Sequence, residues 1–311
     1  MLRLATAFLC LCFLVQAAAA QGADPREPRR YLGYGRLITD DVIGDGEDRW
    51  RTGNWASSRI WGPEWQGRLP ETFGRVLEFR FNGEIVAPEN LAANGPGDRP
   101  FVGILSFGLH THFRRGATDM ALGADLAVIG PQTGLDDFQE FLHDVVGARE
   151  ISSQVRDAQI DNDVEPSLVF EAGREVTLGG GLARLRPFAE ARAGLETMLR
   201  AGADLTIGQV GGRGLMVRDP VTGQRYQVLH DRPAGLSFVL GGDVAYVADS
   251  ELLPDSRGLD VEDARARLRA GVHWENDGGT RLFYGLSWLS KEFESQRESQ
   301  VVGSVRLNLR F

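Results

Sequence analysis

The feature that most limits the fold of this chain is the alternation of apolar and polar side chains along most of its length. In VGSVRLNLRF, the last ten residues, the two kinds of residue take opposite faces: Val305, Leu307, Leu309 and Phe311 against Arg306, Asn308 and Arg310. In ARARLRAGVHWE the same pattern puts Arg265, Arg267 and Arg269 opposite an apolar face. Because side chains alternate between the two faces of a strand, this period of two predicts β-strands with one apolar face each.

We count about twelve such segments, near 31–39, 53–62, 74–84, 101–113, 118–129, 164–175, 185–196, 198–208, 234–248, 264–275, 280–291 and 299–311. An even number of strands of about ten residues, with charges on one face, is typical of a transmembrane antiparallel β-barrel with lipid outside and a polar lumen. The fold class expected is therefore all-β, a barrel of about 12 strands. The alternative is a soluble β-sandwich, which the apolar N-terminus, the terminal Phe311 and the tryptophans at strand ends (Trp55, Trp61, Trp274, Trp288) argue against.

The N-terminus has the order of parts of a signal peptide: Arg3, a short apolar run, and small residues ending at Ala20. We therefore expect a signal peptide at 1–20 and one barrel domain at 21–311, located in the outer membrane. Both cysteines, Cys10 and Cys12, fall in the signal, so the mature chain has no thiol chemistry. The net charge of −9 argues against a nucleic-acid partner.

One stretch breaks the strand pattern. In GPQTGLDDFQEFLHDVVG apolar residues recur with helical spacing, which predicts one amphipathic helix near 134–147 within a loop. Its apolar face, with Phe138, Phe141 and Leu142, needs the barrel rim or the lipid interface to pack on. Gln139 and His143, one turn apart, then face a neighbouring strand or a cleft. Taken alone, the pattern favours an idle, capping or solvent-exposed His143 over a general base.

Two other groups of residues have the chemistry of metal ligands. Five acids crowd into LITDDVIGDGEDRWRTGN: Asp40, Asp41, Asp45, Glu47 and Asp48. Clustered carboxylates suit Ca²⁺, although the spacing is not that of an EF-hand, and a charged hairpin loop without metal is the alternative. His110 and His112 share one strand face and could bind a metal, but no third ligand is spaced nearby.

Four stretches resemble the lipid A 3-O-deacylase (LpxR-like) family of outer-membrane barrels: LITDDVIGDGEDRWRTGN, GDRPFVG, VIGPQTGLDDFQEFLHDVVGA and SKEFESQRESQVVGSVRLNLRF. The likeness covers essentially the whole mature length, and the Gly-Pro to His spacing is its most specific part. It implies a twelve-stranded barrel whose site lies between the wall and a loop helix near the outer leaflet. The implied reaction is Ca²⁺-dependent hydrolysis of the 3-O-linked acyloxyacyl chain of lipid A, with lipopolysaccharide as the partner.

The resemblance also assigns residues. His143 matches the family's general base within its Gln-x-x-x-His helix, which makes Gln139 the glutamine; Thr52 matches the Thr of Tyr-Thr-x-Gly, and Asp41 the Asp of Asn-Asp. Asp41, with Asp40, is the expected metal ligand; Asp41 either holds Ca²⁺ or orients His143.

The chain departs from the family at three positions. Asp40 stands where the family has Asn. If the Asn amide supports the oxyanion in the family, this replacement should lower activity; if the Asn oxygen only binds Ca²⁺, Asp40 could serve instead. Arg51 stands where the family has Tyr. Some members have a site Lys where this chain offers only Arg99, which we expect to meet a phosphate instead. An outer-membrane phospholipase and a non-catalytic barrel or pore are the other functions open to this sequence.

Overall fold

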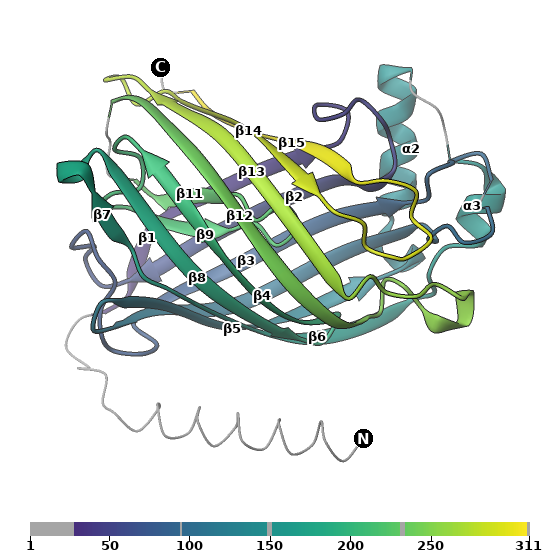
Figure 1. The fold of residues 1–311 in the computed structure, drawn as a ribbon, viewed down its shortest axis with the longest axis horizontal. Helices are drawn as coiled ribbons and strands as arrows, with labels where there is room; N and C mark the ends of the chain where they lie inside the picture. Colours follow the sequence, from purple (N-terminus) through teal and green to yellow (C-terminus); the bar gives the residue numbers. More distant parts are fainter. Residues whose placement is uncertain (1–27, 94, 148–150, 231–233, 310–311) are drawn as a thin grey trace, which may run out of the picture.

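The chain folds into a closed antiparallel β-barrel of twelve strands (Figure 1). A computed structural model describes residues 28–309, apart from 94, 148–150 and 231–233; the predicted signal peptide and Phe311 lie outside the described residues. The barrel strands are β1 (Arg30–Asp40), β2 (Trp50–Gly62), β3 (Val76–Ala87), β4 (Val102–Arg115), β5 (Thr118–Ile129), β6 (Asp163–Gly173), β8 (Ala183–Ala193), β9 (Glu196–Ile207), β12 (Gly235–Ser250), β13 (Ala264–Glu275), β14 (Arg281–Leu289) and β15 (Gln300–Asn308). The twelve strands predicted from the alternation are confirmed.

Two seams close the barrel. Most barrel strands pair with their neighbours in the chain, and the ring is completed by β6 with β8 and by β1 with β15. The first and last strands meet through the pairs Ile38–Val305, Thr39–Ser304 and Asp40–Gly303. A short strand, β7 (Val176–Leu178), continues β6 along the same edge of β8.

The outward and inward faces of the wall differ as the sequence predicts. Outward apolar side chains such as Leu199 and Leu268 are exposed, as expected for a wall that meets lipid. Inward side chains are buried and often charged; the predicted lumenal position of Arg265, Arg267 and Arg269 is confirmed by their burial and their ion pairs.

A hairpin from the segment between β9 and β12 occupies the lumen, and the sequence analysis did not predict it. Its strands are β10 (Leu215–Arg218) and β11 (Arg225–Leu229). One side of the hairpin packs on the inner wall in an apolar cluster that joins Val217 and Val228 to Leu37 and Ile60. β1 can approach β11 closely because Gly35 has no side chain: a Cβ there would lie 2.5 Å from the carbonyl oxygen of Gln227.

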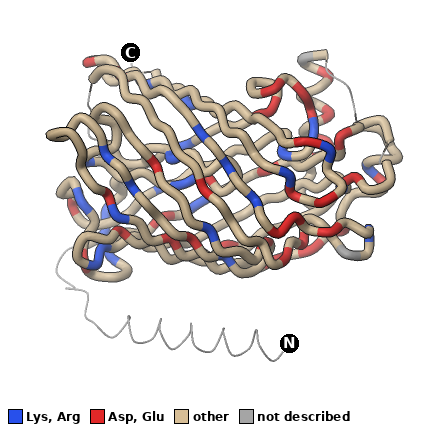
Figure 2. The backbone as a smooth tube through the Cα atoms, viewed as in Figure 1, with Lys and Arg blue, Asp and Glu red and all other residues tan. Residues whose placement is uncertain are grey.

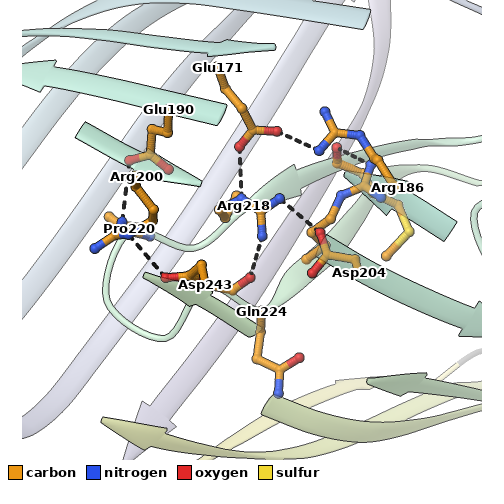
Figure 3. Close-up of polar contacts among 12 residues, drawn as sticks. Glu171, Arg186, Glu190, Arg200, Asp204, Arg218, Pro220, Gln224 and Asp243 are labelled. Atoms are coloured by element: carbon orange, nitrogen blue, oxygen red, sulfur yellow. Dashed lines mark hydrogen bonds and ion pairs between the residues drawn. The ribbon is translucent and has the colours of Figure 1, made fainter. Parts of the chain in front are cut away.

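The other side of the hairpin is held by ion pairs (Figure 3). Arg218 reaches Glu171 on β6 at 2.8 Å and Asp204 on β9 at 2.9 Å. At the hairpin tip, Arg267 donates to the carbonyl oxygens of Pro220 and Val221. These buried charges are paired, as charges away from water must be, and the hairpin fills the barrel in place of an open channel.

The helices gather at one end of the barrel, which we call the outer end because long loops of outer-membrane barrels face outward. There the loop between β5 and β6 holds η1 (Pro131–Thr133), α2 (Leu135–Val146) and α3 (Ser153–Asp157), and the β12–β13 loop holds η3 (Asp255–Arg257). The short η2 (Gly179–Gly181) is the exception, because it follows β7 at the opposite end of the barrel. The helix predicted near 134–147 is thus α2. No helix within the described ranges is long and apolar enough to cross a bilayer. Acidic residues gather in the loops at the outer end (Figure 2).

Candidate active site

Helix α2 is set between two glycines in the left-handed conformation. Gly134, at φ 64°, separates η1 from α2, and Gly147, at φ 70°, ends the helix. Glycine takes this conformation without a steric cost, so the chain can turn sharply at both ends. The loop thereby carries one isolated, amphipathic three-turn helix at the outer end of the barrel (Figure 1).

The polar face of α2 turns toward the barrel and its apolar face turns away. Gln139 and His143 are buried, whereas Phe138, Phe141 and Val145 are 50%, 61% and 68% exposed. Packing of the apolar face on the barrel rim, one of the two expected arrangements, is therefore wrong. A soluble protein would bury such a face, and an outer-membrane protein can present it to lipid.

Opposite α2 lies the turn from β1 to β2, which has an unusual backbone. Trp50 has φ 53°, and no other non-glycine residue in the described part of the chain has a positive φ. Thr52 then occupies a β-bulge, because the register of β2 with β3 shifts between Arg51 and Gly53. Bulges and left-handed residues re-aim side chains and are frequent beside functional sites.

These two segments meet through Asp48. His143 Nε2 lies 3.2 Å from Asp48 Oδ2. The Thr52 hydroxyl donates to Asp48 Oδ1 at 2.6 Å, and Gln139 Nε2 lies 3.4 Å from the same oxygen. We call these four residues the candidate site. The structure thus brings together three of the predicted residues, Thr52, Gln139 and His143, around a carboxylate that the prediction named only as one of five clustered acids.

Asp41 adjoins the candidate site and is fully buried. It accepts a hydrogen bond from the backbone N–H of Arg49 at 2.8 Å, and its Oδ1 lies 3.2 Å from the Thr52 hydroxyl oxygen. Burial, and after it the nearby carboxylates of Asp48 and Asp40, raise the pKa of Asp41 to about 8 against those hydrogen bonds. A buried carboxylate that holds its proton near neutral pH marks an excess of negative charge that a cation can relieve.

Asp40 and Asp41 point to different partners. Asp40 accepts from the backbone N–H of Val42 at 2.9 Å, and it interacts electrostatically with Asp48 and His143 of the candidate site. Within the described ranges, no three His, Cys, Asp or Glu side chains are grouped closely enough to hold a metal ion. The Ca²⁺ site predicted at Asp40 and Asp41 has a suitable charge and carboxylate donors, but these carboxylates are not arranged as a preformed cage.

The β1–β2 turn is fastened to the last strand of the barrel. Gln300 Nε2, at the start of β15, donates to the carbonyl oxygen of Arg49 at 2.6 Å and lies 3.4 Å from Asp41 Oδ2. The backbone N–H of Val301 donates to Asp45 at 3.0 Å. Closure of the barrel by β1 and β15 therefore also fixes the turn that carries Asp48.

Two arginines considered near the site have a different role. Arg51 pairs with Glu84 at 2.6 Å and with Glu292 at 2.8 Å. Arg99 is fully buried and also pairs with Glu292. The expectation that Arg99 meets a substrate phosphate is wrong, because its guanidinium is enclosed by the loops at the outer end.

The two histidines on β4 do not form a metal pair. His110 Nε2 lies 2.7 Å from Asp125, and His112 Nε2 lies 2.6 Å from Glu78. Each imidazole has its own carboxylate on a neighbouring strand. Both are explained as satisfied, buried side chains of the lumen.

The family model described as outer membrane protein LpxR matches residues 7–311. The chain belongs to the LpxR family of outer membrane proteins. The solved structure of LpxR from Salmonella typhimurium superposes with a TM-score of 0.72 at 17% sequence identity, covering 90% of this chain and 100% of that one. This likeness agrees with the fold, and the family places the protein in the outer membrane of Gram-negative bacteria.

Other solved barrels are much less similar. The β-domain of the Bordetella autotransporter BrkA gives a TM-score of 0.37 at 12% identity, covering 90% of this chain and 99% of that one. OprB from Pseudomonas putida gives 0.35 at 8% identity, covering 89% and 93%. No curated protein sequence matched the chain.

Proposed function

We propose that the protein is an outer-membrane esterase that removes the 3-O-linked acyloxyacyl chain of lipid A, with His143 as its general base. The observation that carries the proposal is the placement of His143. It lies beside Asp48 and Thr52, on a helix whose opposite face exposes Phe138 and Phe141 at the outer end. A lipid ester in the outer leaflet can therefore approach a histidine that is held beside polar groups. Family membership and the resemblance to lipid A deacylases supply the substrate class.

The reaction needs one group that first accepts and then returns a proton. His143 takes a proton from water while the water oxygen bonds to the ester carbonyl carbon, giving a tetrahedral oxyanion. The bond between that carbon and the sugar oxygen then breaks, and the sugar oxygen takes the proton from the imidazolium. The products are a free acyloxyacyl fatty acid and a lipid with a free 3-hydroxyl, and His143 is neutral again.

Calcium belongs to the proposal through Asp41 and Asp40. When bound, Ca²⁺ supplies positive charge that polarises the ester carbonyl. Asp41, buried and crowded by like charges, is the residue that would hold the ion, and Asp40 is a second oxygen donor. Binding requires that the proton on Asp41 leaves, so the affinity for Ca²⁺ is expected to rise with pH up to about pH 8.

Mass spectrometry of lipid A from cells that make the wild type or His143→Ala tests the proposal. The wild type is expected to lose the 3-O-linked chain, and His143→Ala to slow this loss at least about 10²-fold. His230→Gln, which changes a histidine beside Arg306 far from the candidate site, is the matched control. Unchanged lipid A with wild-type protein present and folded would refute the proposal.

A second measurement identifies the lipid. Purified protein is given lipopolysaccharide or phospholipid, with and without a calcium chelator, and released fatty acid is measured. Release from lipopolysaccharide alone, lost in chelator, is the expected result. Release from phospholipid alone would make the protein a phospholipase with the same base.

A further inference from the structure

The ion pairs inside the barrel wall are unequal in charge. One connected network of pairs joins the inner wall to the lumenal hairpin, and Figure 3 shows part of it. It contains six arginines and four carboxylates: Arg186, Arg192, Arg200, Arg218, Arg267 and Arg269 with Glu171, Glu190, Asp204 and Asp243. Each arginine has a partner, but the partners are shared. This group, which we call the lumen network, therefore carries an excess of two positive charges.

The excess is not shared by every buried group of charges in the protein. The outer ends of the strands and their loops hold a second network, in which three arginines meet three carboxylates: Arg51, Arg99 and Arg265 with Glu84, Glu196 and Glu292. The carboxylate at the hairpin tip, Asp219, lies outside both networks and accepts hydrogen bonds from Asn54 and Thr222. Positive charge is thus in excess specifically in the lumen network.

Arg225 on β11 adds a further positive charge beside this network. Its guanidinium donates to the carbonyl oxygen of Met216 at 3.4 Å, and it forms no ion pair with a carboxylate in the described part of the chain. Asp204 and Glu171 attract it electrostatically, but each of these carboxylates already pairs with two other arginines. Arg225 is therefore the cation of the lumen with the weakest compensation by the protein.

These positive charges meet at one cavity. Four of its lining residues are Arg186, Arg192, Arg218 and Arg225, and the hairpin closes one side of it. Its lining also includes Leu69 of the β2–β3 loop, so it lies toward the end of the barrel opposite α2. Its volume is about 60 Å³. Since one water needs roughly 10–15 Å³ measured in this way, the cavity can take a few waters or one small ion.

The chemistry of the lining indicates which ion fits. A buried charge without a counter-charge is costly, so a cationic cavity favours an anion. The planar guanidinium fork donates two parallel N–H groups, which match the oxygens of a phosphate or carboxylate. A divalent oxyanion has the charge that would cancel the excess of two in the lumen network. Phosphate and sulfate have both properties.

The wall is shaped to keep Arg186 at this cavity. Gly173 lies opposite it, and a Cβ there would lie 2.3 Å from Arg186 Cζ, so any larger residue would displace the guanidinium. Arg186 Nη1 lies 2.8 Å from Glu171 Oε1, but it has no hydrogen-bond acceptor of suitable geometry among the described residues. This buried N–H group can therefore donate to an anion in the cavity.

We propose that the cavity is a binding site for a small divalent oxyanion of the phosphate class. The anion offsets the excess charge of the lumen network and ties the hairpin, through Arg218 and Arg225, to Arg186 on the wall. Because the cavity lies inside the wall, its ligand is a free anion and not the headgroup of a lipid in the bilayer. The site is independent of the proposed function, since it uses no residue of the candidate site.

The first test measures binding directly. The folded full chain in detergent is dialysed to equilibrium against radiolabelled inorganic phosphate at low ionic strength and about pH 8, where phosphate is mainly divalent. The wild type is expected to bind one phosphate saturably. Sulfate should displace it, whereas acetate, with a single charge, should compete at least about tenfold more weakly. No saturable binding, or equal displacement by acetate and sulfate, overturns the proposal, and neither result depends on the folding of a variant.

The second test places the phosphate in the cavity. Arg225→Gln removes a charged donor and is expected to weaken phosphate binding at least about tenfold, the loss of one charge-assisted hydrogen bond. Met216→Glu puts a carboxylate on a residue that lines the cavity beside Arg225 and is expected to abolish binding. Arg297→Gln, which removes the same charge from a side chain that is 78% exposed at the outer end, is the matched control.

The outcomes separate this proposal from the proposed function. His143→Ala is expected to bind phosphate as the wild type does, and a wild type that hydrolyses no lipid leaves the dialysis result unchanged. Equal affinity for phosphate in the wild type, Arg225→Gln and Met216→Glu overturns the proposal, because the anion then binds elsewhere. Equal weakening in Arg225→Gln and Arg297→Gln also overturns it, because the effect then reports the net charge of the protein and not a site.

Discussion

Glu292 is expected to be the most costly single carboxylate to neutralise in the loops at the outer end. It lies in the β14–β15 loop and bonds to Arg51 on β2 at 2.8 Å and to Arg99 in the β3–β4 loop. Burial disfavours its charge, yet the neighbouring Arg51, Arg99 and Arg265 hold the pKa of Glu292 well below its usual range. These arginines therefore favour the charged form of Glu292 in the folded state.

The size of the effect follows from what Glu292→Gln leaves behind. Arg51 keeps Glu84 and Glu196, but Glu292 is the carboxylate that pairs with Arg99 among the described residues, and Arg99 is fully buried. Removing one partner of a buried ion pair costs about 3–5 kcal/mol, because the other charge stays buried without compensation. Glu298→Gln in the same loop removes the same charge from a side chain that is mostly exposed, and is expected to cost about 0–1 kcal/mol.

Urea titrations of the folded protein in lipid vesicles, followed by tryptophan fluorescence, measure both variants. A group whose pKa is depressed by folding stabilises the fold above its unfolded pKa of about 4.3 and loses this contribution as the pH falls through the folded pKa. The gap between wild type and Glu292→Gln should therefore be full near pH 7 and begin to close below about pH 4. Equal losses for Glu292→Gln and Glu298→Gln at pH 7 would refute the reasoning.

Four further predictions concern Asp41, the lumenal hairpin, Gly35 and Phe141. Because folding raises the pKa of Asp41 to about 8, its contribution to stability is present below its unfolded pKa of about 3.9 and is lost as the pH rises through 8; Asp41→Asn should therefore be the more stable protein at pH 9 in urea titrations, and a wild type that is equally stable at both ends of the range would contradict this. The wild type is expected to pass no current in planar bilayers, and shortening the β10–β11 hairpin should make the barrel conduct. Bilayers that stay silent with the shortened chain would show that the wall closes the lumen by itself. Gly35→Val places side-chain atoms against the carbonyl oxygen of Gln227 and should loosen the same hairpin, lowering the stability of the fold by about 1–3 kcal/mol. Phe141→Ser removes an exposed aromatic ring from α2 and should slow hydrolysis of bilayer-embedded lipid by roughly tenfold, given about 1.5–3 kcal/mol for burying such a side chain, while detergent-dispersed lipid is cleaved as before.

The barrel could be predicted from the sequence because lipid and lumen impose opposite demands on alternate residues. Arg265, Arg267 and Arg269 had to face inward once the intervening residues were apolar. The lumenal hairpin could not be predicted, because it does not meet these opposite demands. The strands Leu215–Arg218 and Arg225–Leu229 are short and enclosed by protein. They do not separate lipid from a polar lumen, so their sequence does not have to alternate apolar and polar residues.

The candidate site was predictable in its parts but not in its assembly. Helical spacing placed Gln139 and His143 on one face of α2, yet it did not say whether the other face meets the rim or lipid, because both are apolar. Asp48 was visible only as one acid among five. Its contact with His143 depends on how two distant loops meet at the outer end, which no local pattern encodes. Arg99 shows the converse, a residue that looked available in the sequence and is enclosed in the fold.

The pairing of β1 with β15 also determines when the candidate site can form during assembly of the barrel. The turn that carries Asp48 is held by Gln300 and Val301 of β15, which reach the turn only when β15 pairs with β1. In a chain that is still crossing the periplasm, β1 and β15 have not yet paired, so the turn and α2 are not held in alignment. The protein would then become active only when the barrel closes. An unfinished chain would not hydrolyse the lipids that it meets on its way to the outer membrane.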